Sequence, residues 1–118
     1  LTYSRMLLFS LQAAEILEKQ GISVEVIDLR TLLPLDKETI KNSVMKTNRV
    51  VIVEEDTKTA GAGAEIGMTV IEECFDYLDA PIKRIAGADV PMPKSPNLEK
   101  LAIPSPERIV EGVKEVLK

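Results

Sequence analysis

Apolar residues spaced three and four positions apart alternate along the chain with short β-branched runs. The helical spacing predicts one helix between Ser4 and Gly21, then helices at residues 37–46 and 64–78 and a last helix that begins at Pro106. The strand pattern predicts a stub at residues 1–3 and strands at residues 22–29, 50–53 and 82–86. Strands therefore alternate with helices, as they do in parallel α/β sheets.

Capping residues mark the ends of the predicted helices. Ser4 and Asp36 precede the first two helices, and Ser105 precedes Pro106 at the start of the last one. Gly21 follows the first helix, where glycine readily adopts the positive φ that ends many helices. We therefore expect Ser4, Asp36 and Ser105 to accept hydrogen bonds from the first turns of their helices.

The strand residues indicate the class of fold. The unbroken run at residues 50–53 predicts a central strand that is buried on both faces. Residues 82–86 include Lys83 and Arg84, which predicts a half-exposed strand nearer an edge. Together these features predict a three-layer α/β/α fold with a mainly parallel sheet of four to five strands, formed by residues 1–118 as one domain.

Two stretches depart from this alternation. Residues 1–3 resemble the end of a strand that leads straight into a helix, so we expect a fragment of a larger subunit whose first strand is truncated. Residues 87–97 contain Pro91, Pro93 and Pro96, which are incompatible with regular helix or a central strand. We expect an ordered irregular loop there.

Composition and charge exclude several classes of function. The chain has 15 Lys and Arg against 19 Asp and Glu, so it lacks the basic surface that nucleic acid requires. It has no histidine and a single cysteine, Cys74, which excludes imidazole-based catalysis, internal disulfides and thiolate metal cages. No apolar run approaches the roughly 20 residues of a membrane span. We expect neither nucleic acid nor a membrane as a partner.

A glycine-rich stretch at residues 60–67 follows a predicted strand and opens a helix, where a phosphate-binding loop would lie. Its last glycine is Gly67, one residue too late for the dinucleotide-binding pattern. Glu54, Glu55 and Asp56 stand between the strand and the glycines and would repel a diphosphate. We therefore expect these glycines to allow close packing against a neighbouring backbone, with phosphate binding as the alternative.

The same three acids follow the most apolar predicted strand, at the edge of the sheet where α/β proteins bind ligands. Carboxylates in that position can bind a divalent metal or transfer protons. Successive strand residues point to opposite faces, so at most Glu54 and Asp56 can converge. We favour a solvated or interface-facing acidic run over a ligand site. We interpret Cys74 as a core residue, since no neighbouring cation is implied that would lower its pKa.

Several motifs resemble one family of enzymes. They are Ser-Val-Glu-Val-Ile-Asp-Leu-Arg-Thr-Leu-Leu-Pro at 23–34, Val-Glu-Glu at 53–55, Ala-Gly-Ala-Gly-Ala-Glu-Ile at 60–66, Leu-Asp-Ala-Pro at 78–81 with Arg84, Gly-Ala-Asp-Val-Pro-Met-Pro at 87–93, and Asn-Leu-Glu-Lys-Leu at 97–101. The first motif resembles the C-terminal domain of the transketolase superfamily. The others resemble beta subunits of the thiamine-diphosphate-dependent 2-oxo acid dehydrogenases, above all pyruvate dehydrogenase. The resemblance runs over the whole chain.

This resemblance implies a function for the parent enzyme. The enzyme would decarboxylate pyruvate on thiamine diphosphate, held with Mg, and would acetylate a lipoyl group. The coenzyme would lie between the alpha subunit and the N-terminal domain of the beta subunit. The resemblance therefore implies that this domain holds no catalytic, cofactor-binding or metal-binding residue and is inert alone.

The resemblance also implies partners: the alpha subunit, a second beta subunit, and the peripheral subunit-binding domain of a dihydrolipoyl acyltransferase. Contacts within the heterotetramer are assigned to Glu54, Asp56, Gly61, Gly63 and Glu65. Docking of the acyltransferase is assigned to Asp79, which matches the acid of the family's acid-Ala-Pro motif. Stabilisation of the local turn is the alternative role for Asp79.

Other enzymes of the superfamily remain alternatives, namely transketolase, branched-chain or acetoin dehydrogenases and deoxyxylulose-phosphate synthase. A free-standing α/β module that binds an anion at residues 61–67 is an alternative of another class. The localisation that the resemblance implies is the cytoplasm, or the mitochondrial matrix or plastid in a eukaryote.

Overall fold

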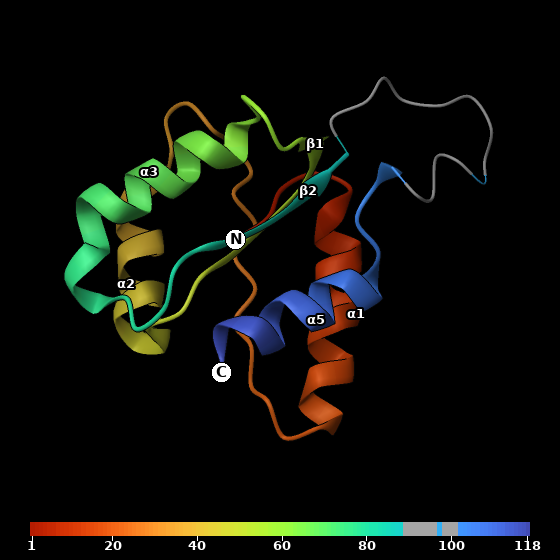
Figure 1. The fold of residues 1–118 in the computed structure, drawn as a ribbon. Helices are drawn as coiled ribbons and strands as arrows, with labels where there is room; N and C mark the ends of the chain where they lie inside the picture. Colours follow the sequence, from red (N-terminus) through yellow and green to blue (C-terminus); the bar gives the residue numbers. More distant parts are fainter. Residues whose placement is uncertain (89–96, 98–101) are drawn as a thin grey trace.

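The computed structural model describes residues 1–88, 97 and 102–118, and this part of the chain forms helices around a small parallel sheet (Figure 1). In chain order the elements are α1 Met6–Lys19, α2 Lys37–Thr47, β1 Val51–Thr57, α3 Ala62–Cys74, the short 3₁₀ helix η1 Phe75–Tyr77, β2 Lys83–Gly87 and α5 Pro106–Val116. Most of the loop expected at residues 87–97 lies outside the described residues.

β1 lies between two parallel neighbours. On one side it pairs with β2 in the register Val51 to Lys83, Ile52 to Arg84 and Val53 to Ile85. On the other side it meets residues 1–3, where Thr2 forms parallel bridges to both Val53 and Asp28. The central position predicted from the β-branched run is therefore confirmed. β2 has β1 as its only strand neighbour among the described residues, which fits the predicted edge.

The predicted count of four to five strands is wrong for the part of the chain that the structure describes, which contains a sheet of two regular strands. Residues 22–29 have no regular secondary structure apart from the bridge at Asp28. The physical reason is pairing: residues 22–26 have no strand partner among the described residues, and a ladder forms only where a partner strand continues beside it.

Helices cover both faces of the strands (Figure 1). α1 and α5 lie on one face, around a core that includes Met6, Leu17, Val53, Ile85 and Val113. α2 and α3 lie on the other face, around a core that includes Ile40, Val44, Ile52, Val70 and Cys74. Adjacent residues of β1 thus enter opposite cores, as the alternation of a strand requires. The layer order α/β/α agrees with the prediction.

Most predicted helix signals are confirmed and one is wrong. The side chains of Asp36 and Ser105 each accept a hydrogen bond from the amide three residues further on, at 3.1 and 3.2 Å. Gly21, with a φ of 79°, follows the end of α1. Ser4 does not cap α1, because Arg5 is the residue before the helix and Ser4 has a φ of 58°. Ser4 instead forms the sharp turn between residues 1–3 and the helix.

α3 begins at Ala62, two residues earlier than predicted, and gives way to η1 after Cys74. Gly61 is consequently the residue before the helix, and Gly63 lies in its first turn. The glycine-rich stretch is therefore the start of α3 itself rather than a loop in front of it.

Candidate functional site

Glu54 is the only fully buried charged side chain in the described part of the chain, with an exposed fraction of 0%. Its carboxylate accepts hydrogen bonds from Tyr3 Oη at 3.0 Å, Arg84 Nη2 at 2.9 Å and the backbone amide of Gly63 at 2.6 Å. Glu54 and its three donors come from four different segments of the chain. One carboxylate thus joins the N-terminal stub, both strands and the start of α3.

Local geometry explains how each donor reaches Glu54. The first turn of a helix has free amides and a positive dipole end, which stabilise a carboxylate placed before it. Arg84 pairs with Ile52, two residues before Glu54 on β1, so both side chains leave the same face of the sheet. An unpaired buried charge costs several kcal/mol, so these donors are required for a carboxylate at this position.

Gly61 and Gly63 allow the helix to start this close to β1. A Cβ atom on Gly63 would lie 2.5 Å from Glu54 Oε1, and one on Gly61 would collide with the carbonyl oxygen of Thr57. The prediction that these glycines serve close packing is confirmed. The group that they approach includes a side chain, the Glu54 carboxylate, as well as backbone.

The same contacts argue against phosphate binding at residues 61–67. The amide of Gly63, which a phosphate oxygen would need, already donates to Glu54. The carboxylate fills the space before the helix, and its charge would repel a diphosphate. Residues 61–67 therefore do not fit the diphosphate of the coenzyme that the resemblance implies, and no step of its chemistry is assigned to them.

Arg84 connects β2 to the segment before α3. Besides Glu54, its Nη2 contacts the carbonyl oxygen of Lys58 at 2.6 Å. Its Nε is buried and has no hydrogen-bond partner within the described residues. Since the side chain is only 20% exposed, the guanidinium acts mainly inside the fold.

Burial and the hydrogen bond to Glu54 raise the pKa of Tyr3 above its ordinary value. The phenol therefore stays neutral and keeps donating to the carboxylate well above neutral pH. Sequence reasoning singled out neither Tyr3 nor Arg84 as a partner of Glu54. The available signal was that both residues lie on segments predicted to be strands of the same sheet as Glu54.

The other acids of this segment lie apart from Glu54. Glu55 forms an ion pair with Arg5 at 3.5 Å. Asp56 is exposed and accepts a hydrogen bond from the next amide at 2.8 Å, and Glu65 is exposed on the first turn of α3. Glu54 and Asp56, the two acids that could converge at most, do not form a joint site: Glu54 is buried and Asp56 is exposed, and the register of β1 shifts between Val53 and Thr57. The interface assignments of these residues stay predictions.

Asp79 lies just after η1, and its side chain is exposed. Its amide donates to the carbonyl of Asn48 at 2.8 Å, and the side-chain amide of Asn48 donates to the carbonyl of Tyr77 at 2.9 Å. These backbone contacts hold the turn against the end of α2 without using the Asp79 carboxylate. The docking role of Asp79 stays a prediction.

Cys74 is buried, as predicted, and burial raises the pKa of its thiol. In the described residues no cluster of three or more His, Cys, Asp or Glu side chains is placed to hold a metal ion. None of the described helices is long and apolar enough to cross a membrane.

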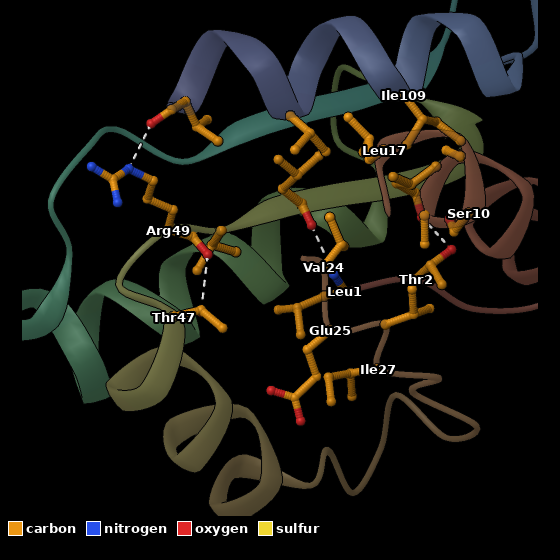
Figure 2. A pocket seen from close by; sticks show the side chains of 18 of the residues that line it. Leu1, Thr2, Ser10, Leu17, Val24, Glu25, Ile27, Thr47, Arg49 and Ile109 are labelled. Carbon is orange, nitrogen blue, oxygen red and sulfur yellow. Dashed lines mark hydrogen bonds between the residues drawn. The ribbon is translucent and has the colours of Figure 1, made fainter. Parts of the chain in front are cut away.

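A cavity of about 140 Å³ lies between the two helical layers, next to the N-terminus (Figure 2). Its faces are formed by α1, α5 and α2, through residues that include Ala13, Leu17, Val113, Ser43 and Val44. Residues 22–27 and 49–51 line it along the plane of the sheet. Sequence reasoning did not predict it, because its lining residues come from segments far apart in the sequence.

The backbone nitrogen of Leu1 lines this cavity and donates to the carbonyl oxygen of Val51 at 2.7 Å.

The fold and the Glu54 site define an α/β domain in which the start of a glycine-rich helix is occupied by the domain's own carboxylate. This chain belongs to the family described as transketolase, C-terminal domain, whose family model matches residues 1–109. A solved structure described as a split-gene transketolase, an inactive beta4 tetramer, is similar with a TM-score of 0.83 and 27% identity. That likeness covers 98% of this chain and 36% of the other.

Curated relatives resemble the chain more closely in sequence. It is 58% identical over 112 residues to pyruvate dehydrogenase E1 component subunit beta-2, mitochondrial, of Oryza sativa subsp. japonica, and 59% identical over 112 residues to the Pisum sativum subunit beta. It is 54% identical over 115 residues to the Rickettsia felis subunit beta. These matches cover 95–98% of this chain but only 30–35% of the relatives, so the chain spans about a third of their length.

Replacement of Arg84 by Met should destabilise the domain by about 3 kcal/mol, because it leaves the buried Glu54 carboxylate with two neutral donors. Urea unfolding measures this loss. Lys83→Met is the matched control, since Lys83 is the preceding residue of β2 and pairs with an exposed carboxylate on Glu115 at 2.7 Å. Equal losses for the two variants would contradict a structural role for the Glu54–Arg84 contact.

Proposed function

We propose that this chain is the C-terminal domain of the beta subunit of a pyruvate dehydrogenase component. The observation that carries the proposal is 54–59% identity to such subunits over nearly the whole chain. The complete enzyme would decarboxylate pyruvate and acetylate a lipoyl group. Its compartment would be the mitochondrial matrix or the bacterial cytoplasm; the names of the plant relatives describe those proteins as mitochondrial.

Within that enzyme the domain acts as a scaffold for assembly with the alpha subunit and the second beta subunit. Its contact surface comprises Asp56 and Glu65, while Glu54, Gly61 and Gly63 support that surface from inside the fold. Nearby on α3 and η1, three large apolar side chains are exposed, by 52% at Met68, 42% at Ile71 and 67% at Phe75. Exposed apolar side chains on α3 and the adjoining η1 support a protein interface on this surface.

Thiamine diphosphate and Mg belong, in this proposal, to the part of the enzyme outside this chain. When bound there, the coenzyme supplies the carbanion stabilisation that decarboxylation of a 2-oxo acid needs. The contribution of residues 1–118 is indirect, because the Glu54 contacts fix the shape of the surface that the other subunits meet. The domain alone should be inert.

Asp79 provides the docking carboxylate for the basic peripheral subunit-binding domain of a dihydrolipoyl acyltransferase. Its exposed side chain and its backbone anchor to Asn48 support this role, since a fixed turn presents the carboxylate in one place. The excess of acidic over basic residues favours a basic partner.

The longer beta subunit that contains this sequence, produced with its alpha subunit, should form a heterotetramer that oxidises pyruvate with an artificial electron acceptor. Its kcat/KM for pyruvate should exceed that for a branched-chain 2-oxo acid by roughly 10-fold or more. Removal of residues 1–118 should abolish assembly, as measured by light scattering. Preference for the branched-chain acid, or transfer of a ketol unit between sugars, would assign the domain to another enzyme of the superfamily.

Asp79→Lys in the full subunit should weaken binding of the peripheral subunit-binding domain by about tenfold or more, mainly through slower association. Surface plasmon resonance measures both rates. Decarboxylation of pyruvate should not change. Glu18→Lys is the matched control, because it makes the same charge change at an exposed position on α1. If Asp79→Lys and Glu18→Lys bind the partner equally well, the docking assignment is wrong.

A further inference from the structure

A cleft of about 550 Å³ runs along the edge of β2 that faces away from β1. All the residues of β2 line it, together with Lys58, which follows β1, and one side of α5. α5 packs closely on β2, since a Cβ atom on Gly112 would collide with the side chain of Ile85. The cleft therefore has an edge of the sheet along its length and a helix beside it. We call it the edge cleft.

Backbone amides of β2 on this edge lack partners among the described residues. The amide of Lys83 donates to a carbonyl just before β1, at 3.2 Å. Because amides alternate in direction along a strand, those of Arg84 and Ala86 point to the other side, and they take part in no hydrogen bond with the described residues. Just past β2, the amide of Ala88 donates to the carbonyl of Ala102 at 2.8 Å. The edge of β2 thus leaves two amides open to a further backbone.

The edge cleft is basic, although the domain is acidic. Its charged lining residues are Lys58, Lys83, Arg84 and Arg108 against Glu111 and Glu115. The whole chain, in contrast, has a net charge of −4. Cations gathered in a cleft raise the local concentration of anions. The charges therefore favour a negatively charged occupant.

Two of these cations are available to a partner. Lys83 and Arg84 already pair with carboxylates of the fold, at 2.7 and 2.9 Å. Lys58 and Arg108 make no ion pair with the described residues. Lys58 lies beside Arg84, which contacts its carbonyl oxygen, whereas Arg108 lines the cleft from α5. Successive side chains of an extended segment point to opposite faces, so two adjacent acidic residues can meet these two cations.

We propose that the edge cleft binds an extended acidic segment of another protein, which adds to the sheet as a strand beside β2. The segment pairs its backbone with Arg84 and Ala86 and places adjacent carboxylates against Lys58 and Arg108. Backbone pairing supplies the affinity, and the side-chain contacts supply the selectivity. A second copy of this chain is a poorer occupant, since two such edges would bring like charges together. The proposal goes beyond the enzymatic function and does not depend on it.

A labelled peptide, blocked at both ends, tests the charge of the occupant. Its sequence is Thr-Val-Glu-Asp-Val-Thr, and the matched control is Thr-Val-Gln-Asn-Val-Thr. Each is titrated by fluorescence anisotropy against the longer beta subunit that contains this chain, produced with its alpha subunit. The acidic peptide should bind about tenfold more tightly or better, and added salt should reduce the difference. Equal affinities, or no binding of the acidic peptide, would overturn the proposal, and the cations would then serve only to keep edges of separate molecules apart.

Substitutions locate the site. Arg108→Gln and Lys58→Gln should each weaken binding of the acidic peptide by about threefold to tenfold. Lys114→Gln is the matched control, because Lys114 is exposed on α5 but does not line the edge cleft. If Arg108→Gln and Lys114→Gln have the same effect, the peptide is attracted by general charge and the proposal is wrong.

N-methylation distinguishes an added strand from an anion that is held by charge alone. Alternate amides of the bound peptide face β2, so methylation of one alternate set should abolish binding and methylation of the other should spare it. Deuterium exchange of residues 83–87 should slow by about tenfold when the peptide is bound. Equal losses for the two methylated forms would contradict strand addition. Protection of residues 83–87 that rises with protein concentration in the absence of peptide would assign the cleft to a second copy and overturn the proposal as well.

Discussion

The need to compensate one buried negative charge governs the arrangement of the described fold. Glu54 has no access to water, so its carboxylate requires donors from the protein. Tyr3, Gly63 and Arg84 supply them from the N-terminal stub, α3 and β2. Each donor fixes the position of its own element relative to Glu54. Together they hold in place the end of β1 and the start of α3, where Asp56 and Glu65 are exposed.

This arrangement separates one buried carboxylate from the exposed ones. Bonds inside the fold occupy Glu54, and a side chain in place of Gly63 would collide with it. Asp56 and Glu65 are exposed on β1 and α3, which the Glu54 bonds join, whereas Asp79 is exposed on a turn that contacts with Asn48 hold in place. The described residues thus combine a fixed interior with exposed acids.

Local signals in the sequence predicted local structure well. Each correct prediction depends on residues that are close together in the sequence. These predictions are the caps at Asp36 and Ser105, the turn at Gly21 and the β-branched run of β1. The partners of Glu54 depend on the order of the parallel strands, because this order places Tyr3 and Arg84 beside Glu54. No local pattern in the sequence encodes the order of the strands. Ser4 was misassigned because a serine before a helix fits a cap and a sharp turn equally well. The count of strands was wrong for the described residues because a strand needs a pairing partner as well as a suitable pattern of its own residues.

The first and last helices share one core, with Met6 of α1 and Val113 of α5 in the same apolar cluster. The opposite core is drawn from residues 29 to 74 and needs neither α1 nor α5. During synthesis on the ribosome, all residues of the core under α2 and α3 emerge well before the core under α1 and α5 can be completed. The apolar face of α1 therefore emerges early and stays uncovered until α5 has been synthesised. This face is the one that a nascent domain has to protect from aggregation.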